Sequence, residues 1–322
     1  MSLPRPSGLT AIKTRGESQG LAWFLSQLWH HGVPIVGVGI LLILVWYGGA
    51  ILLNRGLAEN YIHNQASGEA AQAQIPTAQW VWQSLNLDRP KLPAPDQILV
   101  ELKKSIFEVP TSSKRSLVYH TLVTIKATLF GAGLGLGFGL VLAILLIYLR
   151  SLMASILPWI IASQTIPIIA LAPMLVVILN QLKITGVLPK AMIAAYLSFF
   201  PVTLGMVKGL TSAEPLHLEL FRSYAAREWQ VFLRLRLPAS LPYLFASMRI
   251  GIAASLVGTI VAELTKSEDG GIGSRLLAGS YYGQTVQIWA ALVAASATAL
   301  ILVGLVSVTE KLMLRFMGSN GS

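Results

Sequence analysis

Six long apolar segments constrain this chain more than any other feature of its sequence. A helix needs about 20 apolar residues to cross the hydrocarbon core of a bilayer. The segments are Val33–Leu53, Tyr119–Tyr148, Leu152–Leu182 (interrupted by Pro167 and Pro173), Val187–Leu210, Leu241–Leu264 and Val286–Leu314. They predict an all-α, polytopic membrane protein with six transmembrane helices. A signal peptide is the alternative for the first segment, but its apolar run is too long and no small-residue cleavage site follows closely.

The composition agrees with a surface that faces lipid. Hydrophobic residues make up 54% of the chain and charged residues only 12%, about half the charged fraction of soluble domains. Cysteine is absent, which excludes disulfides and cysteine-based metal sites. The net charge of +10 is spread singly over loops rather than gathered in a stripe, so no nucleic-acid partner is expected.

The basic residues in the short loops predict an orientation. Excess Lys and Arg mark the cytoplasmic side of a membrane protein. One side carries Lys208, Arg222, Arg227, Arg234 and Arg236, and the other carries Lys183, Lys190, Lys266 and Arg275. We assign the first side to the cytoplasm, which places both termini inside and Asn54–Leu117 outside.

Two amphipathic segments flank the first predicted span. Leu21–His31 places leucines and Phe24 on one helical face and predicts an interfacial helix. Asp96 follows Pro95 as an expected N-cap, and apolar residues at helical spacing then predict a short helix that ends near Pro110.

Glycines recur at four-residue intervals in the second predicted span. Gly131, Gly135 and Gly139 form one series, and Gly133 and Gly137 form another. Small residues at this spacing let two helices approach closely. The pattern is compatible with packing inside one bundle and with a seam along a translocation path or between two copies.

Residues 211–242, between the fourth and fifth spans, form a charged and aromatic loop. Glu214–Ala226 suits a helix in which Glu219 and Arg222 can pair. A second helix is expected from Arg227, with a bend near Ala225, an end at Pro238 and the next span beginning at Pro242. A loop of about 30 residues is longer than the usual connection between two helices.

This loop is similar to the coupling loop of binding-protein-dependent ABC-importer permeases of the nitrate, sulfonate and taurine type. That family's pattern has Glu-Ala-Ala, a glycine six residues after the Glu, an aromatic stretch and two Leu-Pro pairs. The matching residues here are Glu219, then Trp229, Gln230 and Phe232, then Leu237–Pro238 and Leu241–Pro242, with Arg249 and Glu263 at charged positions of the fifth span. Leu220–Phe221 and Ala225 depart from the pattern. The similarity covers roughly Leu92–Arg315, and parts of it look closest to permeases for pyrimidines, thiamine precursors or riboflavin.

The resemblance implies a MetI-like ABC permease fold and a transport role. Two permease copies, expected to be a homodimer, would pack together in a bacterial inner membrane. ATPase subunits would bind ATP and Mg²⁺, and a periplasmic binding protein would deliver the solute. This chain would hold no cofactor or metal and have no catalytic residue, and its sequence lacks the P-loop pattern.

The resemblance assigns ATPase coupling to the loop. We expect the apolar residues Phe221, Tyr224, Ala225, Trp229 and Phe232 to dock, because buried aromatic anchors dominate protein interfaces. Phe232 and Leu235 can instead pack against the membrane helices. Glu219 would fix the geometry of the loop.

Polar residues inside the spans are candidates for the solute pathway. They are Gln164, Thr165, Ser198, Ser255 and Thr259. Ser and Thr can instead bond carbonyls of their own helix, whereas the Gln164 amide is harder to satisfy. Arg249 is expected at the cytoplasmic gate or among the lipid headgroups. Glu263 is expected at the outer end of its span, as a gate or structural residue.

Two other classes of protein remain as alternatives. A secondary transporter would show internal repeats or ionisable residues in mid-span, and neither is clear here. A membrane enzyme would need a catalytic or metal site, but the five histidines have no metal-ligand spacing; His120 is expected at the interface.

We divide the chain at residues 32, 53, 117 and 315. The parts are a cytoplasmic tail with the interfacial helix (1–32), the first transmembrane helix (33–53), a periplasmic insertion with an amphipathic helix (54–117), a five-helix permease core (118–315) that includes coupling loop 211–240, and a C-terminal tail (316–322).

Overall fold

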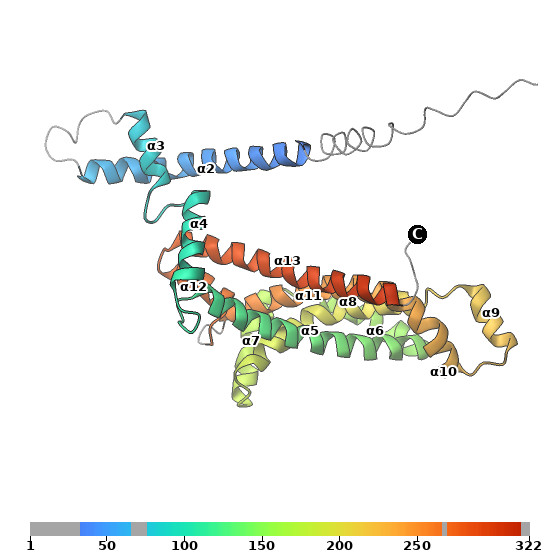
Figure 1. The fold of residues 1–322 in the computed structure, drawn as a ribbon. Coiled ribbons are helices and arrows are strands. Elements are labelled where there is room, and N and C mark those ends of the chain that lie inside the picture. The colour runs from blue at the N-terminus through green and yellow to red at the C-terminus, as the bar shows by residue number, and fades with distance from the viewer. Residues whose placement is uncertain (1–32, 66–75, 266–268, 317–322) are drawn as a thin grey trace, which may run out of the picture. The chain divides into compact units, whose positions relative to one another are not determined.

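The computed structural model describes residues 33–65, 76–265 and 269–316 (Figure 1). Within these ranges the regular elements are all helices, which confirms the all-α prediction. The chain forms two compact units, Met1–Pro95 and Asp96–Ser322. The predicted interfacial helix Leu21–His31 lies outside the described residues.

The first unit is a helical hairpin. α2 (Val33–Gln65) covers the first predicted span and continues beyond it, and α3 (Thr77–Leu85) packs against it. Asn54 is fully buried, and its amide donates to the carbonyls of Ser84 and Leu92 at 3.0 and 2.8 Å. This one side chain therefore satisfies carbonyls at the end of α3 and in the segment that follows it.

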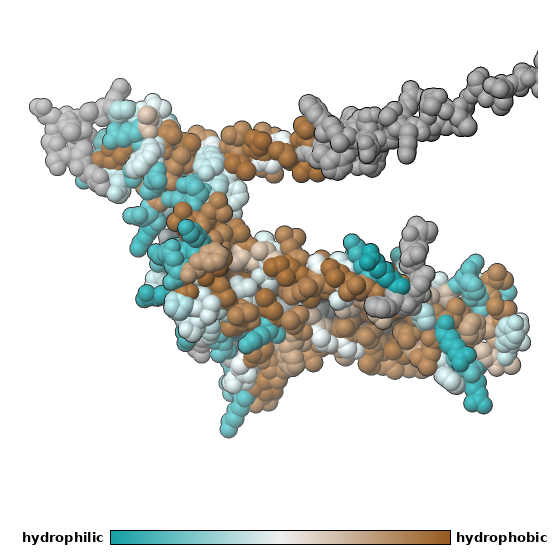
Figure 2. Space-filling model, in the orientation of Figure 1, coloured by the Kyte–Doolittle hydropathy of each residue, from teal (hydrophilic) through white to brown (hydrophobic). Residues whose placement is uncertain are grey.

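Four long helices dominate the second unit. They are α5 (Leu117–Tyr148), α8 (Val187–Leu210), α11 (Leu237–Thr265) and α13 (Thr285–Phe316). With α2, they are the five helices of the described ranges that are long and apolar enough to cross a membrane. Hydrophobic residues cover most of the visible flank of the second unit, and hydrophilic residues gather toward the ends of its helices (Figure 2).

The third predicted span is broken into two helices. α6 (Arg150–Ser163) and α7 (Ile168–Gln181) meet at an angle of 99°. The break falls at Pro167, which lacks an N–H and disfavours helical geometry in the preceding residue. The interruption predicted at Pro167 in the segment Leu152–Leu182 is confirmed, whereas Pro173 lies inside α7. The bent pair is either one broken span or a re-entrant segment.

One of the two glycine series closes the contact between α5 and α8. A Cβ on Gly131 would lie 2.7 Å from the Ala191 carbonyl oxygen, and one on Gly139 would lie 3.0 Å from the Phe199 carbonyl oxygen. A Cβ on Gly133 or Gly137 would meet nothing. Close packing within one chain is therefore the role of the first series, and not of the second.

Shorter helices occupy the ends of the second unit. α4 (Pro95–Lys103) runs into a π-helical segment, η3 (Lys104–Glu108), and α12 (Ile272–Tyr281) joins α11 to α13. α4 begins at Pro95, so Asp96 lies in the first turn and is not the predicted N-cap. A carboxylate in a first turn still interacts favourably with the helix dipole.

Candidate functional site

The segment between α8 and α11 forms a compact loop at one end of the second unit, opposite α12 (Figure 1). α9 (Pro215–Ser223) begins with a proline at its first position, where a missing N–H costs nothing. At the start of α10 (Glu228–Val231), the Gln230 side chain accepts a hydrogen bond from the Arg227 N–H at 2.8 Å. The prediction of two short helices in this loop is confirmed.

Ala225 makes the turn between these two helices in the left-handed conformation, with φ of 50°. Its N–H donates to the Arg222 carbonyl at 2.9 Å, and the Ala226 N–H donates to the Phe221 carbonyl at 3.0 Å. These two bonds form a Schellman motif, a helix end that usually carries glycine. The predicted bend near Ala225 is confirmed, and alanine adopts this conformation at a steric cost of about 1 kcal/mol.

α10 continues into α11 through a π-helical segment, η4 (Phe232–Arg236). The Leu237 N–H donates to the Phe232 carbonyl, five residues back. The wider turn gives room to Pro238, whose ring clashes with the preceding turn of a regular helix. The prediction that one helix ends at Pro238 and the next begins at Pro242 is wrong, because both prolines lie inside α11.

This loop carries five exposed apolar side chains, which we call together the loop patch. They are Leu216 (67% exposed), Leu220 (49%), Tyr224 (78%), Trp229 (55%) and Leu233 (50%). Leu216 and Leu220 are four residues apart and so share one face of α9, and Tyr224 follows after another four residues at the C-cap. Tyr224 and Trp229 were predicted to dock, whereas the three leucines were not, although the four-residue interval between Leu216, Leu220 and Tyr224 is visible in the sequence.

The remaining residues predicted to dock differ in exposure. Ala225 is exposed, whereas Phe221 and Phe232 are half-buried. The Phe232 ring lies 6.1 Å from the Tyr148 ring and packs against the buried cluster of α5, α6 and α8. Arg236 donates to the Leu210 carbonyl at the end of α8, at 3.2 Å. Phe232 and Arg236 thus hold the loop to the bundle while the loop patch stays exposed.

Glu219 lies on the exposed surface of α9 and makes no ion pair with Arg222, which the structure also describes. The Nδ1 atom of His217 instead lies 3.4 Å from the carboxylate of Glu214, the N-cap residue of this helix. The predicted Glu219–Arg222 pair is therefore wrong. Exposed pairs of this kind gain little free energy, so the helix does not depend on it.

Gln164 lies in the break between α6 and α7. Its Nε2 atom is buried and has no hydrogen-bond partner among the residues that the structure describes. Thr165 beside it is exposed, and its hydroxyl donates to the Ala162 carbonyl at 2.7 Å. A buried amide without a partner costs free energy, so Gln164 differs from the other polar residues of the spans.

Ser198, Ser255 and Thr259 lie in the interior of the helical bundle. All three are at most 1% exposed. The Ser255 hydroxyl donates to the Thr128 carbonyl at 2.9 Å, and the Thr128 hydroxyl donates to that of Thr259 at 3.1 Å. Ser198 donates to the Ala195 carbonyl of its own helix at 3.2 Å. These bonds give each hydroxyl a packing role, and a place on the solute pathway stays a prediction for all three.

Arg249 joins two of the long helices. Its guanidinium lies 3.4 Å from the Glu310 carboxylate, so that α11 is paired with α13. The Arg249 side chain is 39% exposed and the Glu310 side chain 16%. The pair is half-buried and gives Arg249 a structural partner; its assignment to a gate stays a prediction.

A buried polar cluster, which we call the polar junction, lies at the α12 end of the unit. It consists of Thr124 on α5, Lys190 on α8, Glu263 on α11, Gly270 just before α12, and Gly273 within α12. The Thr124 hydroxyl donates to the Glu263 carboxylate, and so does the Gly273 N–H at 2.9 Å. Lys190, 1% exposed, donates to the Gly270 carbonyl at 2.7 Å. Neither Thr124 nor Lys190 was predicted to lie near Glu263, because no local pattern links these residues.

His120 extends the polar junction. It lies in the first turn of α5 and is only 7% exposed, and its place at the membrane interface stays a prediction. Its Nε2 lies 2.9 Å from the Lys114 carbonyl oxygen, and its Nδ1 accepts a hydrogen bond from the Gly271 N–H at 3.0 Å. Nε2 therefore carries the proton in a neutral ring, and His120 fixes the segment that leads into α12.

These features define a class of protein. Several apolar helices, a broken helix with a buried unpaired amide, and a helical loop with an exposed apolar patch are together typical of a membrane-spanning transport component. The family profile of the binding-protein-dependent transport system inner membrane component matches residues 135–314. The chain belongs to this family of ABC-type transport permeases, which confirms the resemblance found in its sequence.

Three relatives illustrate the breadth of this similarity. A probable ABC transporter permease protein of Haemophilus influenzae is 31% identical over 47% of this chain and 60% of its own length. The formylaminopyrimidine transport permease protein ThiX of Halalkalibacterium halodurans is 29% identical over 56% of this chain and 67% of its own length. The riboflavin transport system permease protein RibX of Chloroflexus aurantiacus is 30% identical over 62% of this chain and 73% of its own length. This chain thus spans less than two thirds of the Haemophilus relative.

Proposed function

We propose that this chain is the permease subunit of an ABC importer and that the loop patch couples it to a separate ATPase subunit. The observation that carries the proposal is the loop itself. Five apolar side chains, among them Tyr224 at 78% and Trp229 at 55% exposure, stand on a loop whose other side chains anchor it to the bundle. An exposed apolar patch on an anchored element is typical of a docking surface.

The connection from the loop patch to the bundle supports a mechanical role. α10, η4 and α11 form one uninterrupted helix over Glu228–Thr265. Trp229 and Leu233 lie near its beginning, and Glu263 of the polar junction lies near its end. A displacement imposed on the loop by an ATPase would therefore be transmitted along α11 to the opposite end of the unit.

Under this proposal the loop lies in the cytoplasm and α12 faces the periplasm. ATP and Mg²⁺ would be bound by the ATPase, and this chain would contribute coupling and a path without catalysing a reaction. A binding protein would deliver the solute from outside, and a second copy of this chain would complete the pathway as a homodimer in the bacterial inner membrane.

We place the solute pathway at the break between α6 and α7. Gln164 supports this placement, because its buried Nε2 lacks a partner within the described chain and is free to bind a polar solute. The names of two relatives specify formylaminopyrimidine and riboflavin transport. We therefore propose a small polar organic solute, of the pyrimidine or vitamin-precursor type.

The test replaces one residue of the loop patch. Tyr224→Asp puts a charge where the proposal requires apolar contact, so uptake by cells and association with the ATPase are expected to fall at least about tenfold. Leu99→Asp on α4 makes the same change at an exposed apolar side chain, 66% exposed, at the other end of the unit, and is expected to keep both activities.

Membrane insertion of each variant is measured by fractionation and protease protection. Full uptake by Tyr224→Asp would contradict coupling through the loop patch. Uptake that continues without any ATPase, driven by an ion gradient, would favour a secondary transporter instead.

A further inference from the structure

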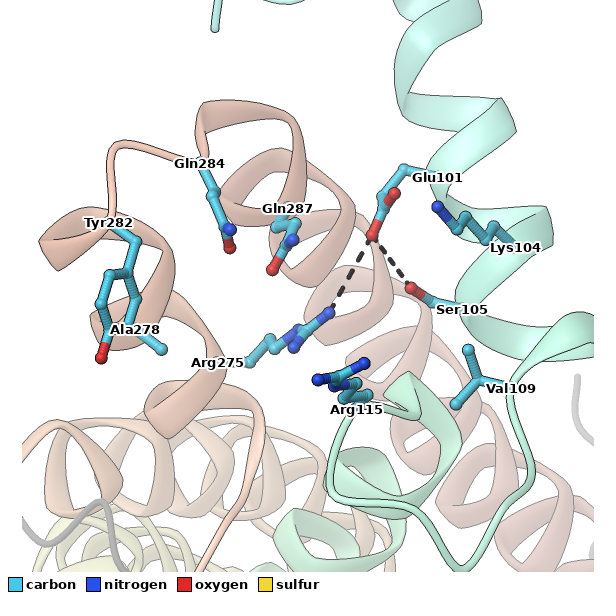
Figure 3. A pocket seen from close by; sticks show the side chains of 10 residues that line it. All are labelled: Glu101, Lys104, Ser105, Val109, Arg115, Arg275, Ala278, Tyr282, Gln284 and Gln287. Atoms are coloured by element: carbon cyan, nitrogen blue, oxygen red, sulfur yellow. Dashed lines mark hydrogen bonds and ion pairs between the residues drawn. The ribbon is translucent and has the colours of Figure 1, made fainter. Parts of the chain in front are cut away.

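A polar pocket of about 620 Å³ lies at the α12 end of the second unit (Figure 3). Volumes of this order hold small-molecule ligands in other proteins. The pocket is lined by side chains of α4 and η3, the segment before α5, α12 and the start of α13. Those that carry charge are Glu101, Lys104, Arg115 and Arg275.

The charges in this pocket do not balance. Lys104, Arg115 and Arg275 face a single carboxylate, that of Glu101. The Arg275 guanidinium lies 4.0 Å from the Glu101 carboxylate, which is a long contact for an ion pair. The same carboxylate also accepts a hydrogen bond from Ser105 at 3.1 Å. Glu101 therefore neutralises only part of the positive charge.

The surroundings of Arg275 also carry more positive than negative charge. Its side chain is 17% exposed. Burial lowers the pKa of the Arg275 guanidinium; the charge of Glu101 opposes this effect and the charge of Arg115 adds to it. A negative group brought between the two arginines would relieve their repulsion and compensate for the burial.

Neutral hydrogen-bond donors complete the lining. Gln284 and Gln287 are half-buried, and Figure 3 shows both side chains directed toward the space beside Arg275. Tyr282 contributes a phenol to the same pocket. Two guanidinium groups with amide donors around them match an oxyanion, because arginine binds carboxylate and phosphate groups through paired N–H groups.

The pocket is separate from the pathway proposed above. None of its lining residues comes from α6, α7 or α8, whereas Gln164 lies between α6 and α7. The pocket is connected instead to the polar junction, through α12. Arg275 lies in the first turns of α12, where the Gly273 N–H is bonded to Glu263 and the Gly271 N–H to His120. A ligand held by Arg275 would therefore act on a segment tied to α5 and α11.

We propose that this pocket is an oxyanion-binding site for a carboxylate, sulfonate or phosphate group presented from outside the membrane. The group is either part of a free anion or an acidic side chain of the docking binding protein. Its orientation toward the outside, and the second source, rest on the proposed function.

The first arm of the test titrates the full chain, embedded in nanodiscs, with acetate, methanesulfonate and inorganic phosphate, with choline as a cationic control. Calorimetry measures the affinity. The second arm titrates the same nanodiscs with a periplasmic binding protein selected because uptake through this permease depends on it. Both arms compare the wild type with Arg115→Gln, Arg275→Gln and Lys114→Gln, the last being a neighbouring cation that does not line the pocket.

We expect Arg115→Gln and Arg275→Gln to weaken binding in one arm by about tenfold or more, while Lys114→Gln binds as the wild type does. A response in the first arm identifies a free anion, and a response confined to the second identifies the acidic side chain. Arg115 is exposed, so its variant remains informative if the loss of the Arg275–Glu101 contact impairs folding.

Equal affinities of all variants in both arms, or no binding in either, would overturn the proposal. Neither result depends on ATPase coupling. Loss of coupling through Tyr224 is measured separately, so a failure of the proposed function can be distinguished from a failure of this site.

Discussion

The hydroxyl of Thr124 lies 2.9 Å from one carboxylate oxygen of Glu263 and 3.0 Å from the other. The two residues are separated by 139 positions in the chain, and neither side chain is exposed. The Thr124 hydroxyl also accepts a hydrogen bond from the Ile272 N–H at 2.9 Å. One threonine thus joins α5, α11 and the start of α12, and this contact is the centre of the polar junction.

Loss of the Glu263 carboxylate is expected to destabilise the protein strongly. Glu263→Ala leaves the donors of Thr124 and Gly273 without an acceptor in a fully buried site, at a cost of about 3 kcal/mol. Thr124→Val is expected to cost about 1 kcal/mol. The double variant should cost clearly less than the sum, because the two changes remove one shared contact. Thermal unfolding in nanodiscs measures all three, and strictly additive effects would contradict direct coupling.

The two glycine series of α5 give a matched pair of substitutions. Gly131→Ala places a Cβ 2.7 Å from the backbone oxygen of Ala191, so α5 and α8 must move apart at a cost of about 1–3 kcal/mol. Gly133→Ala meets nothing and should be neutral or slightly stabilising, because alanine is a better helix former. Unfolding midpoints of the two variants test this. Equal midpoints would show that α5 and α8 are not in close contact in the membrane.

The left-handed conformation of Ala225 predicts that one substitution at this position is stabilising. Ala225→Gly removes the penalty of the left-handed conformation at φ 50° and should stabilise the turn by about 1 kcal/mol. Ala226→Gly is the control, since Ala226 has no positive φ and glycine there only increases the entropy of the unfolded chain. Resistance of the loop to limited proteolysis reports the difference. A turn that Ala225→Gly leaves unchanged or loosens would argue against this conformation.

Substitutions of Gln164 can separate an effect on stability from an effect on transport. Gln164→Leu removes an amide whose buried Nε2 has no partner in the described part of the chain, so the stability should be unchanged or raised by up to about 1 kcal/mol. Uptake of the solute should fall, because the polar group proposed to face it is gone. Gln164→Asn keeps an amide with its N–H donors and serves as the polar control. Wild-type uptake by Gln164→Leu would remove this residue from the proposed pathway.

Periodicity and composition determined the long helices of this protein. The predicted segment Val187–Leu210 coincides with α8, and the other long spans agree with α5, α11 and α13 within a few residues. A run of about 20 apolar residues must form a helix in a bilayer, because each backbone N–H and C=O has to be satisfied within the segment. Pro167 and Ala225 were also recognisable, since proline interrupts a helix and a turn of that kind requires a positive φ.

Only the tertiary structure decided which polar side chains meet. Thr124, Lys190 and Glu263 lie far apart in the chain, and no local pattern brings them together. Pro238 was misplaced because its tolerance inside a helix depends on the π-helical turn before it. The two glycine series look alike in the sequence, and only the position of α8 distinguishes them. Local chemistry fixes whether a segment is a helix, whereas the packing of helices fixes which of its faces is buried and what each buried polar group bonds to.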